Sequence, residues 1–357
     1  MGYNSTELEK SQDVKLDSEI IEKFAPKRQS AELLAESYCR IGYVNKAQRV
    51  SECGTLLEFH RAVNAVSAPP SVNGRAEAVG TADGWKLHNA NFCRDRLCPM
   101  CSWRRSYKIF GQVSQIMDVI ADDYCFIFLT LTVPNCEFDK LCDTLDELQK
   151  GWYRFIHYKP VKTAVRGYFK VLETTRNRNN GTYHPHFHII LAVDKNNYFN
   201  GREYIKRDEW LELWQKAMRD PSITQVDVRR CKPKEEIKEG ETAVKALSSA
   251  VAEVAKYSVK SSDYLIPGDE QTTDDVVITL GAALNNRRLC SFGGVFDEVR
   301  KKLQLDDCEN GDLIHVDGSE IRSDVAVMIR KYGWSCGAYK LIEERREVNI
   351  NIECDEE

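Results

Sequence analysis

The stretch from 167 to 193, GYFKVLETTRNRNNGTYHPHFHIILAV, decides how this chain folds. Its two ends, GYFKVLETTR (167–176) and HFHIILAV (186–193), are rich in the β-branched and aromatic residues that strands favour. The polar NRNNG between them is a turn sequence, so the stretch predicts a β-hairpin. Because Pro185 cannot donate a hydrogen bond to a strand ladder, we expect regular pairing to begin after it.

Segments on both sides of the hairpin extend this pattern into a mixed domain. A strand and an amphipathic helix are predicted before it, at 126–133 (FIFLTLTV) and 139–157. After it we expect a helix, a strand and a second helix, at 207–218, 223–230 and 241–260. The order β-α-β-β-α-β followed by a helix predicts an α+β fold of the ferredoxin-like type, an antiparallel sheet with helices on one face.

Three of the seven histidines lie within the predicted hairpin. Since strand residues two apart point to the same face, His186 and His188 project together and could chelate a divalent metal. His184 is a weaker candidate ligand because it precedes Pro185. Folding back at the turn brings Glu173 opposite the histidine pair or diagonal to it. A structural role is usual for one histidine in a strand, but two imidazoles and a carboxylate favour a metal site with positions open for a phosphate oxygen or water.

The composition of the 357 residues is that of a soluble globular protein, with 42% hydrophobic and 29% charged residues. No apolar run is long enough to cross a membrane, and the N-terminal residues contain no signal-peptide core, so we expect a cytoplasmic protein. Thirteen cysteines, an odd number without a secretion signal, favour reduced thiols over a disulfide framework, and some of them could bind metal.

The formal net charge of −5 does not by itself indicate a nucleic-acid-binding protein. Basic residues are nevertheless concentrated in two runs: residues 93–108 contain five against one acidic residue, and residues 159–178 contain six against one. Such local basic faces suit a protein that grips DNA only at its site. A solvated charged surface is the alternative for either run taken alone.

The predicted helix 241–260 carries side chains suited to phosphoryl transfer. Its apolar stripe consists of Leu247, Val251 and Val254. Glu253 and Tyr257 lie four residues apart on another face, flanked by Lys256 and Lys260, which can neutralise phosphates. A tyrosine that attacks a phosphodiester forms a phosphotyrosine ester and releases a 3′-OH, but a free phenol has a pKa of about 10 and needs activation, for example by a metal. The same Glu–Tyr spacing occurs on ordinary surface helices, and the preceding histidine hairpin is what favours catalysis.

A group of cysteines has the spacing of a metal-binding knuckle: Cys93, Cys98 and Cys101. A tetrahedral ion needs a fourth ligand, for which Cys53 is the best candidate and His60 and His88 are alternatives. We therefore expect a structural Zn²⁺ site, with unligated thiols as the alternative; no βαβ pattern supports a redox role. Arg104 and Arg105 follow the knuckle directly and could contact DNA.

Four segments together resemble a known family. They are FLTLTVPN (128–135), HPHFHIIL (184–191), EVAKYSVK (253–260) and CRDRLCPMCSWRR (93–105). In combination they resemble the motifs of the rolling-circle plasmid replication proteins of the HUH endonuclease superfamily, in the family with a single catalytic tyrosine. Residues 280–317 are similar to that family's C-terminal part, so the resemblance covers approximately residues 50–320.

The resemblance implies an enzyme that nicks and rejoins DNA. Tyr257 would nick the plasmid double-strand origin and become joined to the 5′ end, and Glu253 would activate a water at termination. The divalent metal, Mg²⁺ or Mn²⁺, would be held by His186, His188 and Glu173. The implied partner is single-stranded or hairpin origin DNA. Since the chain has no G-x-x-x-x-G-K motif, a host helicase and replication machinery are inferred as well, and an oligomer is compatible with the sequence.

The chain is expected to have four parts. They are a polar helical segment (1–50), a cysteine-rich zinc-binding module (51–110), the endonuclease core (120–265) and a C-terminal region that could bind origin DNA (266–357).

Two other functions are compatible with these motifs. A relaxase or transposase of the same superfamily usually has a third histidine after the pair, where this chain has Ile189, Ile190 and Leu191. A non-catalytic zinc protein that binds origin DNA and controls copy number would show no metal-dependent cleavage.

Overall fold

The computed structural model describes residues 13–62, 84–231, 251–255, 259–316 and 327–347. The chain divides into two compact units: unit 1 is Met1–Tyr107 with Asp312–Glu357, and unit 2 is Lys108–Gly311. Both ends of the chain therefore contribute to unit 1, and the four parts expected from the sequence do not coincide with these units. Within the described ranges, no helix is both long and apolar enough to cross a membrane.

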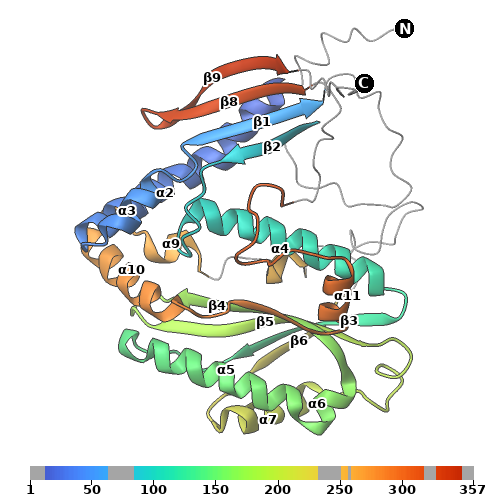
Figure 1. The fold of residues 1–357 in the computed structure, drawn as a ribbon. Helices are drawn as coiled ribbons and strands as arrows, with labels where there is room; N and C mark the ends of the chain where they lie inside the picture. The colour runs from blue at the N-terminus through green and yellow to red at the C-terminus, as the bar shows by residue number, and fades with distance from the viewer. Residues whose placement is uncertain (1–12, 63–83, 232–250, 256–258, 317–326, 348–357) are drawn as a thin grey trace, which may run out of the picture. The chain divides into compact units, whose positions relative to one another are not determined.

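Unit 2 is built around an antiparallel sheet that contains five strands among the described residues (Figure 1). The strands are β3 (Tyr124–Thr132), β4 (Val165–Arg176), β5 (Tyr183–Asp194), β6 (Val226–Arg230) and β7 (Cys290–Gly294). They lie in the order β6-β3-β5-β4-β7, and every neighbouring pair is antiparallel. The helices between the first four strands are α5 (Leu141–His157), α6 (Lys159–Ala164) and α7 (Arg207–Met218). The element order β-α-β-β-α-β is the one that the sequence predicts.

Helices cover both faces of this sheet, so the expectation of helices on one face is wrong (Figure 1). On one face, Trp152 of α5 packs edge-on against Tyr168 and Phe187 of the strands. The core on the other face takes side chains from α4 (Pro99–Ile120), from residues 251–255 and from α11 (Val295–Lys302). The reason lies in β5, whose central residues are almost all apolar. A strand that is apolar on both faces must be covered on both.

The β4–β5 hairpin has the register that places Glu173 directly opposite His186. Pairing begins at Tyr183 and not after Pro185, which corrects the sequence-based expectation. Tyr183 exchanges two backbone hydrogen bonds of 2.8 Å with Cys136, on the side away from β4. The nitrogen of Pro185, two residues further on, faces the same side, so its missing N–H interrupts no hydrogen bond between β4 and β5.

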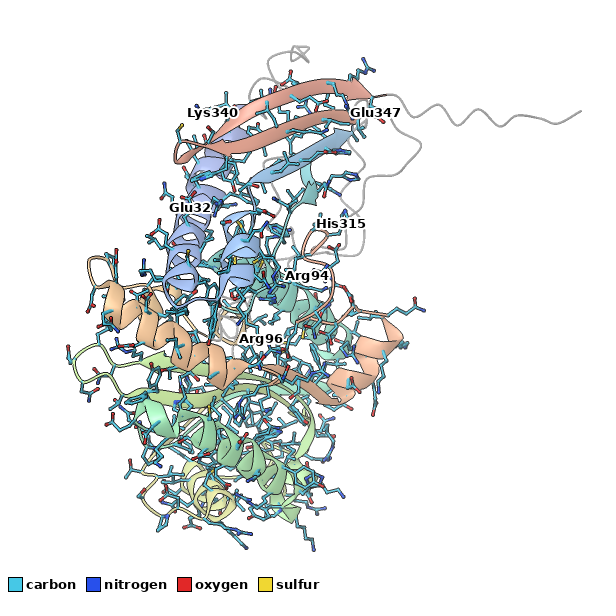
Figure 2. The ribbon with its side chains drawn as sticks, turned by 60° about the vertical axis from the view of Figure 1, so that its left-hand side comes forward. Glu32, Arg94, Arg96, His315, Lys340 and Glu347 are labelled. Carbon is cyan, nitrogen blue, oxygen red and sulfur yellow. The ribbon has the colours of Figure 1, made fainter. Side chains whose placement is uncertain are left out.

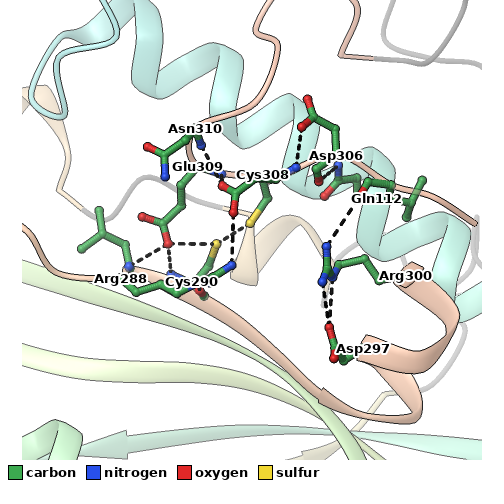
Figure 3. A network of polar contacts seen from close by, with 12 residues as sticks. Gln112, Arg288, Cys290, Asp297, Arg300, Asp306, Cys308, Glu309 and Asn310 are labelled. Carbon is green, nitrogen blue, oxygen red and sulfur yellow. Dashed lines mark hydrogen bonds and ion pairs between the residues drawn. The ribbon is translucent and has the colours of Figure 1, made fainter. Parts of the chain in front are cut away.

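The C-terminal third of the chain contributes to both units. In unit 2, β7 pairs with β4, and α9 (Ser261–Tyr264) and α10 (Glu270–Leu284) precede it. The carboxylate of Glu309 accepts hydrogen bonds from the backbone N–H groups of Leu289 and Cys290, both at 2.9 Å, and ties the segment after α11 to β7 (Figure 3). Gly294 has a φ of +54°, and a Cβ there would lie 2.2 Å from the carbonyl oxygen of Arg166, so only glycine permits this close approach of the two strands.

Unit 1 combines a second antiparallel sheet with N-terminal helices (Figure 1). Its described strands, in the sheet order β2-β1-β8-β9, are β2 (Trp85–Ala90), β1 (Leu56–Ala62), β8 (Val327–Ser335) and β9 (Ala338–Glu347). Its described helical segments are residues 13–19, η1 (Ile20–Phe24), α2 (Ala25–Arg40), α3 (Val44–Ser51) and the first turns of α4. Phe24 packs edge-on against both Phe59 of β1 and Trp103 of α4, which joins the helices to the sheet.

Candidate functional site

Glu173 of β4 and His186 and His188 of β5 converge on one point of the unit 2 sheet. Oε2 of Glu173 lies 2.9 Å from Nε2 of His188 and 3.6 Å from Nε2 of His186. The two Nε2 atoms are 3.2 Å apart. No side chain of the three is more than 11% exposed. The alternation of the strand and the position of the turn bring the three residues together as the sequence predicts.

Each histidine of this cluster has a second contact that orients its ring. Nδ1 of His186 lies 3.0 Å from the carbonyl oxygen of His184. A carbonyl can only accept, so Nδ1 of His186 carries a proton and Nε2 is the ring nitrogen that faces the cluster. Nδ1 of His188 lies 3.2 Å from Oγ1 of Thr130, which is opposite it on β3. Sequence reasoning missed Thr130, because the β3–β5 register is needed to find it.

The donor set of the cluster fits a metal ion. Burial raises the pKa of Glu173, but hydrogen bonds and charges from His186 and His188 outweigh it and hold that pKa well below its usual range. The ionised carboxylate therefore faces two imidazole nitrogens at contact distance. Two nitrogens and one carboxylate oxygen are ligands that divalent metals accept, and the three groups could hold one such ion.

Residues 251–255 and Lys260 lie on the same face of the sheet as the cluster. Val251 and Val254 are fully buried in the core on that face, as the predicted apolar stripe requires. Nζ of Lys260 lies 3.9 Å from Oε1 of Glu173, although Lys260 is itself half-exposed. Glu253 is partly exposed on the short helical stretch. The predicted nucleophile Tyr257 lies outside the described residues, as do Lys256 and Leu247 of the same predicted helix.

Two further charged residues, Arg178 and Asp263, stand next to Lys260; Arg178 ends the basic run 159–178, whereas no sequence pattern had pointed to Asp263. The guanidinium of Arg178 donates a hydrogen bond of 2.6 Å to the carbonyl oxygen of Ser262. Burial raises the pKa of Asp263, while the positive charges of Lys260 and Arg178 oppose that shift. The edge of the cluster thus carries both signs of charge, and the cations are on its exposed side.

Four cysteines form a second candidate metal centre, in unit 1: Cys53, Cys93, Cys98 and Cys101. The Sγ atom of Cys53 lies 3.5 Å from that of Cys98 and 3.6 Å from that of Cys101, and the Sγ atoms of Cys93 and Cys101 are 3.7 Å apart. Four thiolates around a tetrahedral Zn²⁺, with Zn–S bonds of about 2.3 Å, have sulfurs about 3.8 Å apart. The sulfur spacing therefore fits a tetrahedral ion.

The backbone around these cysteines is arranged to support thiolates. The N–H of Arg94 donates to Sγ of Cys101 at 3.2 Å, and the N–H of Cys93 donates to Sγ of Cys53 at 3.4 Å. Hydrogen bonds from Cys53 and Cys93 lower the pKa of the Cys101 thiol, and the charge of Arg105 adds to this effect. Figure 2 shows the sulfur atoms in yellow beside Arg94.

The alternative fourth ligands, His60 and His88, are not in the cysteine cluster. The sulfur of Cys53 converges with the three sulfurs of the knuckle, while the two histidines form a separate group with Glu58. Of the candidates weighed for the fourth position, the structure therefore brings Cys53 to the knuckle.

The two arginines that follow the knuckle, Arg104 and Arg105, donate hydrogen bonds to backbone carbonyls within unit 1. Arg104 is 7% exposed, and its guanidinium donates to the carbonyl oxygens of Leu313 and Ile314 at 2.8 and 2.7 Å. Its burial does not match the DNA-contacting role expected from the sequence. Arg105 is partly exposed and donates to the carbonyl oxygens of Arg94 and Asp95, at 2.5 and 3.1 Å, so it braces the loop of the cysteine cluster.

Comparisons with known proteins give a consistent result. The profile of a family described as "Replication protein" matches residues 84–340. A "Protein rep" of Bacillus amyloliquefaciens is 40% identical over 307 residues, which cover 82% of this chain and 85% of that protein. Those of Streptococcus pneumoniae and Lactiplantibacillus plantarum are 34% and 35% identical, over 79% and 75% of this chain and 80% and 83% of theirs.

No solved structure matches the chain. The family match spans both candidate metal centres except Cys53, and the similar proteins are aligned over most of their length as well as most of this one. The chain therefore belongs to the Rep_1 family of plasmid replication proteins.

Proposed function

We propose that this protein initiates rolling-circle replication of a plasmid by nicking one strand of the double-strand origin, and later rejoins and releases that strand. The observation that carries the proposal is the convergence of Glu173, His186 and His188, with Lys260 beside it. The ferredoxin-like strand order β6-β3-β5-β4 is the sheet expected of an HUH endonuclease core and supports the same function.

Tyr257 is the proposed nucleophile. Three residues of extended chain span at most about 11 Å, which limits how far Tyr257 can be from Lys260 and hence from the cluster. Its phenolic oxygen attacks the scissile phosphorus, so that a Tyr–O–P bond forms and the bond from phosphorus to the 3′ oxygen breaks. The phenolic proton passes to solvent and the leaving 3′ oxygen takes up a proton. The products are a 5′-phosphotyrosyl protein and a strand with a 3′-OH primer.

The side chains of the cluster have separate proposed tasks. A divalent cation, Mg²⁺ or Mn²⁺, held by Glu173, His186 and His188 would supply Lewis acidity that polarises the scissile phosphate. Lys260, and Lys256 with it, neutralises phosphate charge near the reacting centre.

Glu253 is proposed to act in a second step. At termination it serves as a general base that takes a proton from a water, which attacks the phosphotyrosine ester. The Tyr–O–P bond breaks, the phenol regains its proton, and the DNA strand is released with a 5′ phosphate. When a DNA 3′-OH attacks instead, the strand is rejoined and the phenolate leaves.

The four-cysteine cluster is proposed to bind a structural Zn²⁺. The sulfur spacing and the two N–H···S contacts support this role, because thiolates in a closed tetrahedral site stabilise a fold without taking part in chemistry. It would hold the loop at 93–98 against the turn at Cys53.

The proposed partner is origin DNA presented as a single strand or hairpin at the nick site. A host helicase would unwind the duplex and the host replication machinery would extend the 3′ end, and oligomerisation on the origin is compatible with this role. Arg104 is left out of the proposed DNA surface because its guanidinium is bonded to backbone carbonyls.

The deciding experiment uses an oligonucleotide that carries the hairpin of the cognate origin. Labelled at its 3′ end, the strand should become covalently attached to the protein when Mg²⁺ or Mn²⁺ is present and not when EDTA is added. Labelled at its 5′ end, the same strand should yield a shorter product that a polymerase can extend. Binding without cleavage under all metal conditions would favour a non-catalytic copy-control protein.

Two tyrosine variants locate the nucleophile. Tyr257→Phe should abolish the adduct while retaining origin binding, because only the attacking oxygen is lost. Tyr264→Phe is the matched control and should still form the adduct. An adduct that persists in Tyr257→Phe would refute the assignment.

A further inference from the structure

A third group of metal-binding side chains lies on the unit 1 sheet, away from the cysteines: Glu58 and His60 of β1 and His88 of β2. Each offers one ligand atom, and these atoms lie within 4.8 Å of one another. Nothing in the proposed nicking reaction uses this group, and the zinc knuckle is complete without it.

A β-bulge brings the third residue into the group. Glu58 and His60 are two apart on β1 and share a face of the sheet. The β1–β2 register shifts between Glu58 and Phe59: Phe59 pairs with Leu87 and Glu58 pairs with Asn89, so His88 is the extra residue. Bulges of this kind re-aim a side chain, and here the bulge turns His88 to the face of Glu58 and His60.

The contacts within the group hold its three side chains close together. Nε2 of His60 lies 2.7 Å from Oε1 of Glu58. The rings of His60 and His88 are stacked face to face, with centroids 3.7 Å apart and planes 17° from parallel. The other carboxylate oxygen of Glu58 lies 3.5 Å from Nζ of Lys331, which leaves Oε1 for the histidine side of the group.

A neighbouring segment lies next to the open side of the group. The ring of His315 meets that of His88 edge-on at 6.1 Å, and its Nδ1 lies 2.7 Å from Oδ2 of Asp312 (Figure 2). His315 does not belong to the converging set, so three protein ligands meet here among the residues that the structure describes.

We propose that Glu58, His60 and His88 form a binding site for a divalent transition-metal ion of the Zn²⁺ class. Two imidazoles and one carboxylate are typical of such ions and unlike the all-oxygen sets that Mg²⁺ and Ca²⁺ prefer. Binding replaces the hydrogen bond between Nε2 of His60 and Oε1 of Glu58. The ion would cross-link β1 to β2 and stabilise unit 1. The site is independent of the nicking reaction.

The test is a count of bound Zn²⁺ on the full chain by equilibrium dialysis at a fixed free concentration, followed by elemental analysis. Wild type should bind one equivalent more than His60→Ala and one more than His88→Ala. The matched control is His157→Ala, which replaces an exposed histidine of α5 whose Nδ1 lies 2.7 Å from the carbonyl oxygen of Tyr153. It should bind as wild type does.

Cobalt distinguishes this site from the cysteine cluster. With Co²⁺ in place of Zn²⁺, His60→Ala should retain the intense thiolate-to-metal charge-transfer band of the cysteine site while losing one equivalent. Cys53→Ser should lose that band but still bind the Co²⁺ ion at Glu58, His60 and His88, which His60→Ala cannot bind.

Equal metal content in wild type, His60→Ala and His88→Ala would overturn the proposal and leave a hydrogen-bonded Glu58–His60 pair with the ring of His88 stacked on that of His60. Circular dichroism checks that each variant is folded. If His60→Ala is not, His88→Gln decides the question, because His88 is exposed and its replacement is tolerated more easily. A nicking assay run in parallel should be unchanged in His88→Gln, which separates failure of this site from failure of the proposed function.

Discussion

Nζ of Lys260 lies 3.9 Å from Oε1 of Glu173, so the segment that follows residues 256–258 is paired with the hairpin that carries the histidines. Glu173 uses its other oxygen, Oε2, for His186 and His188. One carboxylate therefore connects a candidate metal centre to a cation three residues beyond the proposed nucleophile. If a metal ion is bound there, a phosphate that enters between this ion and Lys260 would meet positive charge from both sides.

Replacing Glu253 should separate the two proposed steps. Glu253→Ala is expected to nick the origin oligonucleotide at a near wild-type rate, since the attacking phenol is retained. Hydrolytic release of the covalent adduct should fall roughly 10²- to 10⁴-fold, which is the usual contribution of a general base. The measurement is the decay of purified adduct over time. Glu253→Gln should behave alike, and loss of nicking itself in both variants would show that the role is not confined to termination.

Thr130→Val should weaken metal binding without touching a ligand. It removes the oxygen that lies 3.2 Å from Nδ1 of His188, and loss of such an orienting contact typically costs about 10- to 100-fold in metal affinity. Titration with Mn²⁺ followed by calorimetry measures the change, and excess metal should restore nicking. Thr132→Val on the same strand is the control, because Oγ1 of Thr132 contacts a carbonyl of Gln225 instead. Equal affinity in the two variants would contradict the orienting role.

Cys53→Ser should release one equivalent of zinc and destabilise the protein. Cys53 is fully buried among the other cysteines, and a structural site contributes its binding energy to folding. A loss of about 3 kcal/mol corresponds to a fall in melting temperature of roughly 6–12 °C for a unit of this size. Scanning calorimetry and elemental analysis provide the two readouts. The exposed Cys142→Ser serves as control, and unchanged zinc content in Cys53→Ser would exclude this ligand set.

Lys170 should make stability depend on pH. Burial lowers its pKa from 10.5 to about 7, although Cys290 and Glu309 oppose this shift. Between pH 7 and pH 10.5 the Lys170 amine is therefore protonated in the unfolded chain and neutral in the folded one. Stability then rises with pH over this range. The cost of burying the charged amine is absent above pH 10.5 and grows as the pH falls towards 7. Lys170→Met should raise the free energy of unfolding at pH 7, by about 1–3 kcal/mol, and by less at pH 10.

Chemical denaturation at the two pH values tests this expectation. The exposed Lys162→Met controls for the loss of a positive charge in the same region. A stabilisation that is equal at both pH values, or equal in the two variants, would assign the effect to something other than the buried ammonium group. The hydrogen bond of 2.9 Å from Lys170 to Gln149 is lost in the variant and limits the gain.

Short-range pattern was enough to predict the hairpin and the residues that meet across it. Glu173 lies opposite His186 because a short turn connects two strands whose side chains alternate with a period of two. The same local signals predicted the order of strands and helices through β6. They did not show that β5 is covered on both faces, although its continuous apolar run is consistent with it.

Residue types and spacing predicted which side chains are candidate metal ligands, from the cysteine knuckle and from the two histidines on one strand. Only the tertiary structure shows which distant residues complete each group. Cys53 joins the three cysteines of the knuckle, whereas His60 and His88 lie together with Glu58. The tertiary structure also buries Arg104, whose charge had suggested DNA contact. Its guanidinium donates hydrogen bonds to the carbonyl oxygens of Leu313 and Ile314, more than two hundred positions away in the chain. Such contacts depend on how elements that are distant in the sequence pack together. This packing produces no periodic pattern in either segment, so it cannot be predicted from the sequence pattern alone.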